Sequence, residues 1–172
     1  IDISAPDGTL VKLGQIALAG QVPDKFKIQL KGDTLTVVSA VPRNWSGDWS
    51  APQNQPRTMV ETFSLAQPAT PVKLGSLELG VGETVHATRF SGDRLYVVTF
   101  LTIDPLWVVD LSDPRKPTLL GELEVPGFST YIEPLGDRLI AIGRVASRTA
   151  VSLFDVSDPA APTLLSQLPL GE

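Results

Sequence analysis

Aspartate recurs beside serine and proline in this chain, a pattern that could bind a cation or support a turn. Ile1-Asp-Ile-Ser-Ala-Pro is echoed by Val109-Asp-Leu-Ser-Asp-Pro and by Phe154-Asp-Val-Ser-Asp-Pro. Calcium takes roughly six to eight oxygen ligands, usually from closely spaced residues such as those of a D-x-D-x-D-G loop. Each copy of the motif here supplies only one or two aspartates, such as Asp110 in one copy and Asp155 in the next. We therefore expect them to cap turns, and we predict no metal site.

The chain has few residues for nucleophilic catalysis. His86 is its only histidine, it contains no cysteine, and no G-x-S-x-G motif occurs. A hydroxyl nucleophile needs a base beside it, so we predict no catalytic residue and no cofactor. Paired carboxylates for glycoside hydrolysis are an alternative, because Glu83, Asp104 and Glu133 could approach one another in space.

Polar residues recur in the first strand expected in each copy of the repeat. Aligning the copies places Gln29, Arg89 and Glu133 in one column, with Tyr131 in a neighbouring column and His86 in the same strand. These five side chains could line a channel and hold a small ligand or water. The alternative is solvation combined with ion pairing between repeats, for example between Arg89 and Glu133.

Two of the three tryptophans lie four residues apart in a segment rich in residues that break strands. Trp45, Asp48 and Trp49 belong to residues 42–57, which show no strand alternation. An exposed tryptophan is costly unless it packs or binds, and aromatic loop residues suit partner anchoring or sugar stacking. These three residues are therefore candidates for ligand binding. The alternative is that the segment folds back as a lid.

An internal repeat must position these residues. Apolar segments that follow the aspartate motifs end at residues 14, 75, 121 and 166, in steps of 61, 46 and 45. A second marker, Gly-Asp before an apolar strand, occurs at Gly32, Gly92 and Gly136, in steps of 60 and 44. The long first step contains 14 extra residues, because Gly32 to Leu74 spans 42 residues and Gly92 to Leu120 spans 28. The segment 42–57 is therefore predicted to be an inserted loop.

The periodicity within each repeat is that of β-strands. One copy predicts strands near 84–91, 94–101, 106–111 and 118–125, rich in β-branched and aromatic residues. Gly92-Asp93 predicts a tight hairpin turn, because glycine tolerates a positive φ. A repeat of about 45 residues with four antiparallel strands is the size of one propeller blade. A β-sandwich is the alternative, but it needs no such period.

We therefore predict an all-β fold, a β-propeller fragment of about three complete four-stranded antiparallel blades plus one extra outer strand. Residues 1–20 would form the outer strand of a preceding blade. The three blades would cover 21–82, with the inserted loop 42–57, then 83–126 and 127–172, all in one domain. Because rings usually hold about 4 to 8 blades, we expect self-association or further blades beyond this fragment. The first strand of each blade lines the channel, which makes the polar columns channel-lining candidates.

Composition excludes some partners. A net charge of −5 provides no broad basic face for nucleic acid. No apolar run approaches the roughly 18 residues of a membrane span, so we expect none in this chain. The absence of cysteine excludes disulfides but does not indicate a compartment.

Three segments carry a family resemblance: Arg89-Phe-Ser-Gly-Asp-Arg-Leu-Tyr-Val-Val-Thr-Phe, Asp104-Pro-Leu-Trp-Val-Val-Asp-Leu-Ser-Asp-Pro and Leu120-Gly-Glu-Leu-Glu-Val-Pro-Gly-Phe-Ser-Thr-Tyr. Together they resemble the secreted prokaryotic β-propeller family, which is distantly related to WD-40 proteins. The close match covers roughly residues 84–168, about half of the chain. The resemblance implies an extracytoplasmic, often membrane-tethered propeller, and it implies no reaction.

Together these observations predict a non-catalytic interaction module outside the cytoplasm, which binds a protein or a glycan through its loop face. One alternative is a carbohydrate-acting hydrolase or lyase with a site in the central channel. The other is a purely architectural repeat of a larger surface protein. Fold class alone does not separate them.

Overall fold

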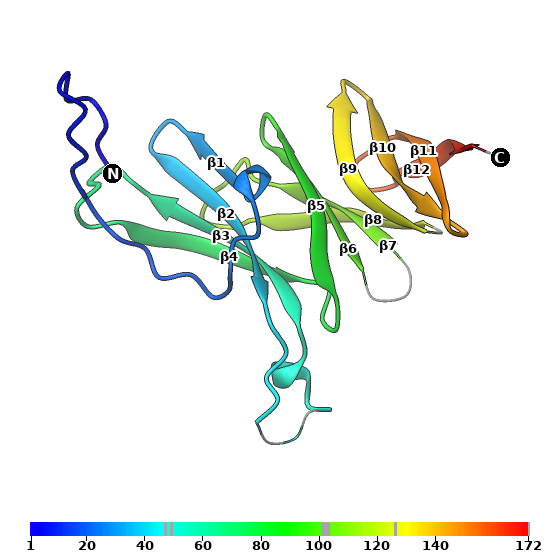
Figure 1. Ribbon diagram of the computed structural model, residues 1–172, viewed down its shortest axis with the longest axis horizontal. Coiled ribbons are helices and arrows are strands. Elements are labelled where there is room, and N and C mark those ends of the chain that lie inside the picture. Colours follow the sequence, from blue (N-terminus) through cyan, green and yellow to red (C-terminus); the bar gives the residue numbers. More distant parts are fainter. Residues whose placement is uncertain (47, 49, 101–103, 126, 172) are drawn as a thin grey trace.

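The computed structural model describes residues 1–46, 48, 50–100, 104–125 and 127–171 of the chain. Within these residues, twelve strands form three four-stranded antiparallel sheets that stand side by side (Figure 1). Each sheet follows chain order, β1-β2-β3-β4, β5-β6-β7-β8 and β9-β10-β11-β12, and we call them blades 1, 2 and 3. The all-β architecture of three antiparallel four-stranded blades is thus confirmed.

The bounds of the strands repeat with the sequence motifs. Blade 1 contains β1 (Ile28–Lys31), β2 (Thr34–Val41), β3 (Arg57–Ser64) and β4 (Val72–Leu79). Blade 2 contains β5 (Thr84–Ser91), β6 (Arg94–Phe100), β7 (Asp104–Asp110) and β8 (Thr118–Val125). Blade 3 contains β9 (Phe128–Leu135), β10 (Arg138–Val145), β11 (Arg148–Asp155) and β12 (Thr163–Leu170). The strands of blade 2 lie where the sequence predicted them, within two residues at each end.

The helical elements of the described residues are two 3-10 turns of three residues each, η1 (Lys25–Lys27) and η2 (Pro52–Asn54). Neither is long enough to cross a bilayer, which needs about 20 residues in a helix. η1 takes the place of the first half of the opening strand of blade 1, so β1 is four residues long whereas β5 and β9 have eight.

The Gly-Asp markers form the hairpin turns between the first and second strands of each blade. Gly32, Gly92 and Gly136 have φ values of 56°, 61° and 61°, in the left-handed region that glycine adopts without a steric penalty. The sequence prediction of a tight turn at Gly92-Asp93 is confirmed, and the other two markers form the same kind of turn.

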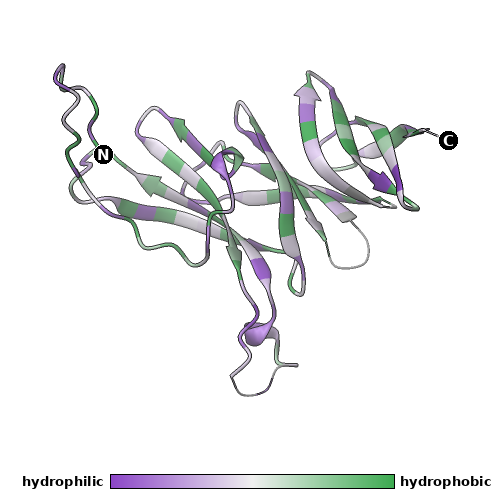
Figure 2. Ribbon diagram, viewed as in Figure 1, coloured by the Kyte–Doolittle hydropathy of each residue, from purple (hydrophilic) through white to green (hydrophobic). Residues whose placement is uncertain are grey.

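Alternate residues of the central strands build the core. In β6, Leu95 and Val97 pack toward blade 1, whereas Tyr96 and Val98 pack toward blade 3. All four are buried, so blade 2 has an apolar contact on both faces, which is the pattern of a sheet covered on two sides. Figure 2 shows the hydrophobic residues concentrated along the strands, with polar residues at the turns.

A glycine near the start of the outer strands β4 and β8 lets neighbouring blades approach. A Cβ atom would lie 2.7 Å from the Arg115 carbonyl oxygen at Gly75, and 2.5 Å from the Pro159 carbonyl oxygen at Gly121. These distances are shorter than carbon and oxygen tolerate, so only glycine fits. The outer strand of one blade therefore lies directly against the turn before the outer strand of the next.

Residues 1–24 take the position of an outer strand without forming one. Gly14 lies against Pro68 as Gly75 lies against Arg115, but the pairing is limited to two bridges, Asp2 with Val11 and Gln21 with Ala40. The segment 1–20 thus lies where the extra outer strand was expected, but it does not form a strand. A strand needs a ladder partner, and the described residues contain no further strand beside this segment.

Candidate functional site

Arg89 on β5 joins the first strands of blades 2 and 3. Its Nη2 atom lies 2.9 Å from Glu133 Oε2, and its Nε–H donates to the Ile132 carbonyl at 3.0 Å. The Tyr131 hydroxyl donates to the same Glu133 oxygen at 2.7 Å. These contacts lower the pKa of Glu133, the Tyr131 hydrogen bond most and the Arg89 charge less. The ion pair between blades that the alignment suggested is therefore present.

The same guanidinium lies between two aromatic rings. Its carbon is 4.5 Å from the centroid of Phe26 and 4.8 Å from that of Tyr131. A cation over the face of an aromatic ring is attracted by the quadrupole of the ring. Because Phe26 belongs to η1, Arg89 to β5 and Tyr131 to β9, this stack ties together the inner edges of all three blades.

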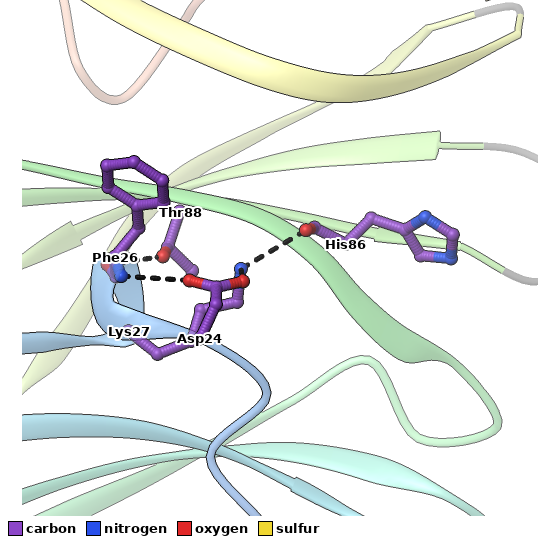
Figure 3. Close-up of polar contacts among 5 residues, drawn as sticks. All are labelled: Asp24, Phe26, Lys27, His86 and Thr88. Carbon is purple, nitrogen blue, oxygen red and sulfur yellow. Dashed lines mark hydrogen bonds and ion pairs between the residues drawn. The ribbon is translucent and has the colours of Figure 1, made fainter.

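A second polar cluster fixes η1 against β5 (Figure 3). The Asp24 carboxylate accepts from the Phe26 backbone N–H at 2.8 Å and from Lys27 Nζ at 2.9 Å, and Lys27 also donates to the His86 carbonyl at 3.2 Å. The Thr88 hydroxyl donates to the Phe26 carbonyl at 2.7 Å. Lys27 is only 2% exposed, and a buried ammonium needs such partners. Partial burial of Asp24 opposes ionisation, but the bonds from Lys27 and Phe26 still lower its pKa.

Of the five residues predicted to line a channel, Arg89, Tyr131 and Glu133 are brought together and two are not. The His86 ring turns away from the Lys27 cluster in Figure 3 and lies edge-on to Phe100, with centroids 5.5 Å apart. Desolvation first, and the charge of Lys27 second, lower the pKa of His86. His86 is also the extra residue of a β-bulge in β5, which redirects it.

Gln29 lies apart from Arg89 because each of these two residues points toward the blade that follows its own. Gln29 pairs with Thr36 in β2, and Arg89 pairs in the same way with Tyr96 in β6. Gln29 therefore lines a groove between blades 1 and 2, whereas Arg89 bridges blades 2 and 3.

Sequence reasoning missed the part played by Asp24, Phe26 and Lys27. The available signal was an aspartate two residues before a phenylalanine, because an aspartate that accepts from the backbone two residues on starts a tight turn. The alternation of an extended strand was instead continued through these positions.

The repeated aspartates cap turns, as predicted. Asp110 and Asp155 each accept a hydrogen bond from the backbone N–H two residues on, Ser112 and Ser157, at 2.9 Å. Asp2 does the same for Ser4 at 2.8 Å. Among the described residues, no group of three or more His, Asp or Glu side chains is arranged to hold a metal ion. Among the carboxylates considered for glycoside hydrolysis, Glu83 accepts from the Thr99 hydroxyl, and Glu133 is paired as above.

The inserted loop runs from residue 42 to residue 56 and projects away from the blades at the lower side of Figure 1. It does not fold back as a lid, and Trp45 is 78% exposed. The Arg43 guanidinium lies 5.3 Å from the centroid of the Trp45 ring. Trp49 lies outside the described residues.

Hydrogen bonds within the loop hold its backbone. Asn44 and Asp48 each accept from the serine two residues on, through both its backbone N–H at 3.0 Å and its hydroxyl at 2.6 Å. The hydroxyl bond from Ser50 is the main cause that lowers the pKa of Asp48. The Asn54 amide donates to the Asp48 carbonyl at 2.7 Å, which closes the loop across its width.

The base of the loop is attached to the connection between blades 1 and 2. Gly82 N–H donates to the Pro56 carbonyl at 2.7 Å, and Arg57 Nε lies 2.9 Å from Glu78 Oε2. The loop therefore belongs to the end of the blades that carries the connections from one blade to the next, as the strand order requires.

Four-stranded antiparallel blades joined in chain order, with polar first strands that meet along an axis, define the propeller class of repeat protein. A family model described as a beta propeller domain matches residues 1–172, and the chain belongs to that family.

Two archaeal relatives share part of the sequence. One is an uncharacterised protein of Methanocaldococcus jannaschii, 48% identical over 85 residues, which are 48% of this chain and 13% of the relative. The other is an uncharacterised protein of Archaeoglobus fulgidus, 42% identical over 77 residues, which are 44% of this chain and 12% of the relative. The chain therefore aligns with a small share of each relative's length.

Proposed function

We propose that this domain is a non-catalytic interaction module, displayed outside the cytoplasm, which binds a protein or a glycan through the face that carries the inserted loop. The observation that carries the proposal is the exposure of Trp45, 78% of whose surface faces solvent on a loop that leaves the blades. Tryptophan is enriched among the residues that contribute most of the binding energy at interfaces. The proposed location rests on the family resemblance.

The bracing of the loop supports a binding role over a merely tolerated insertion. The turns at Asn44 and Asp48 and the bond from Asn54 to Asp48 hold the loop backbone before any partner arrives. A loop that is already ordered loses less conformational entropy on binding. The same loop carries the Trp45 ring and the Asp48 carboxylate, and an aromatic ring and a carboxylate acceptor suit a sugar ring or a protein side chain.

Binding and location can be tested separately. The labelled domain is applied to a glycan array and to immobilised surface proteins of the source cells, as wild type, as Trp45→Ala and without residues 44–56. Leu135→Ala is the matched control, because Leu135 is also an exposed apolar residue, in blade 3. We expect retention that Trp45→Ala and the deletion abolish and Leu135→Ala leaves unchanged. Retention that neither loop variant affects would contradict the proposal, as would protection of the protein when intact cells are treated with protease.

We also propose that the outer faces of blades 1 and 3 are covered in the functional protein, by further blades or by a second copy. Ile28 and Leu30 of β1 are exposed at one end, and Leu168 and Leu170 of β12 at the other. These residues occupy the same sheet faces that are buried between the blades described here. Light scattering of the isolated chain at micromolar concentration is expected to show association, and a stable monomer on dilution would contradict this proposal.

A further inference from the structure

A polar groove lies between blades 1 and 2, with a volume of about 200 Å³. It opens at the end of the blades that carries the hairpin turns, opposite to the inserted loop, because antiparallel order places these two sets of connections at opposite ends. Its lining residues are Gln29, Lys31, Thr34 and Thr36 of blade 1 and Gly92, Asp93, Leu111, Ser112 and Pro114 of blade 2.

The equivalent space between blades 2 and 3 is filled by larger side chains. Counting from the Gly-Asp markers, Thr34 and Thr36 of blade 1 correspond to Arg94 and Tyr96 of blade 2. Gln29 corresponds to Arg89, because Gln29 pairs with Thr36 and Arg89 pairs with Tyr96. Tyr96 is fully buried. The groove therefore exists because blade 1 carries a shorter side chain at each of these three repeat positions.

Arg94 shows what this space accepts. Its Nη1 atom donates to the Val156 carbonyl at 3.3 Å. Val156 and Leu111 occupy equivalent positions, because each donates its backbone N–H to the carbonyl of the aspartate in the hairpin turn of its own blade. Val156 donates to Asp137 at 3.0 Å, and Leu111 donates to Asp93 at 2.7 Å. Between blades 2 and 3, the Val156 carbonyl accepts from a guanidinium. The equivalent residue, Leu111, lies in the wall of the groove between blades 1 and 2.

We propose that this groove binds an arginine side chain presented by a partner protein or peptide. The planar guanidinium has several fixed donors, and the groove offers the Leu111 carbonyl, the Ser112 hydroxyl and the Asp93 carboxylate as acceptors. Asp93 is paired with Lys31, but both side chains are more than half exposed, and an exposed ion pair is readily exchanged. The methylene groups of the arginine would lie against the apolar atoms of Thr36 and Leu111.

Charge separates this ligand from others. The Lys31 ammonium in the groove is already paired with Asp93, so an anion would have to displace that carboxylate, and a sugar would find no aromatic ring among the residues that line the groove. The proposal is independent of the loop function, because the groove and the inserted loop lie at opposite ends of the blades.

The test is a titration of the isotope-labelled chain, followed by amide chemical shifts, with the blocked tripeptide Gly-Arg-Gly. The matching peptides with citrulline and lysine, and glucose, are the comparisons. We expect shifts confined to the groove, at Asp93, Leu111 and Ser112, and binding of the arginine peptide roughly tenfold tighter than that of the uncharged citrulline peptide, because bonds to charged groups are stronger.

Three variants decide the location of the site. Thr34→Arg combined with Thr36→Tyr gives blade 1 the side chains of blade 2 and should abolish the shifts. Asp93→Asn should weaken binding, whereas Asp137→Asn, at the equivalent turn of blade 3, should not. If the double variant does not fold, the comparison of the two aspartates still decides. Equal binding of arginine and citrulline, equal effects of the two aspartate variants, or glucose binding in the groove without arginine binding would overturn the proposal.

Discussion

The interface between blades 1 and 2 and the interface between blades 2 and 3 share a backbone design and differ in side chains. Both have a glycine of one outer strand against the next turn, at Gly75 and Gly121, and both have an apolar centre. Toward the hairpin turns the second interface is filled by Arg94 and Tyr96, whereas the first is left open. A repeat can therefore vary a few positions beside its core and gain a groove while the apolar centre of the interface is kept.

The largest effect is expected from the apolar centres, where the two interfaces should behave alike. Leu95 packs toward blade 1 and Leu139 packs between blades 2 and 3, and both are fully buried. Leu95→Ala and Leu139→Ala should each lower the free energy of unfolding by about 2–5 kcal/mol. Urea unfolding followed by circular dichroism measures both. A loss in one variant only would show that the two interfaces do not contribute to one cooperative unit.

Exchanging the residues that differ should give unequal results. Tyr96→Thr removes a buried ring and is expected to cost about 3 kcal/mol, because the neighbours cannot collapse into the space. Thr36→Tyr places the ring in a groove that has room for it and should change stability by less than about 1 kcal/mol. Thermal unfolding of the two variants checks this. Equal losses would show that the groove is not available space.

The glycine contact should be costly to alter only where a next blade is present. A Cβ atom at Gly121 would lie 2.5 Å from the Pro159 carbonyl oxygen, so Gly121→Ala should cost about 1–3 kcal/mol. Ser166 occupies the equivalent position in β12 and is exposed, and Ser166→Ala should stay within about 0.5 kcal/mol of wild type. The midpoints of urea unfolding provide the comparison.

The smallest effect is expected from the axial ion pair, which is found only between blades 2 and 3 among the described residues. The pKa of Glu133 is lowered from its ordinary value of 4.5, mainly by Tyr131 and then by Arg89. A carboxyl whose pKa falls on folding stabilises the folded state above that ordinary value, and this contribution is lost as the pH falls through the lowered pKa. Glu133→Gln should therefore lower the melting temperature slightly at pH 7 and not at pH 3. Glu124→Gln, at an exposed strand position, is the control.

The strands and turns of blade 2 could be predicted from the sequence because local chemistry determines them. Gly92 needs a positive φ, and the run from Arg94 to Phe100 is rich in β-branched and aromatic residues, which favour a strand. The ion pair of Arg89 with Glu133 followed from aligning repeats, since the two residues share one column and lie on the first strands of neighbouring blades.

The remaining features depend on side chains that meet across blades. The 3-10 turn η1 replaces half a strand because Asp24 holds Phe26 and Lys27, which pack against a strand about sixty residues away. The groove beside Thr36 exists because blade 1 has a threonine where blade 2 has the larger Tyr96. Strand periodicity predicts which residues form a strand, but it carries no information about the length of their side chains. The outer strand expected over 1–20 was inferred from motif spacing. The spacing predicts where this segment lies in the fold, but it does not show whether a neighbouring strand is present to pair with it.

The segment before η1 makes the two ends of the molecule unequal in how readily they open. Gln21 and Ala40 exchange two backbone hydrogen bonds at 2.8 Å, and the Ala19 N–H donates to the buried Glu61 carboxylate at 3.0 Å. Blade 3 has no such cover among the described residues. In a protein whose repeats contact only their neighbours, local unfolding begins where a neighbour is missing. In the isolated chain, amide hydrogen exchange should accordingly be fastest in β11 and β12, slower in β2 and β3, and slowest in β6 and β7.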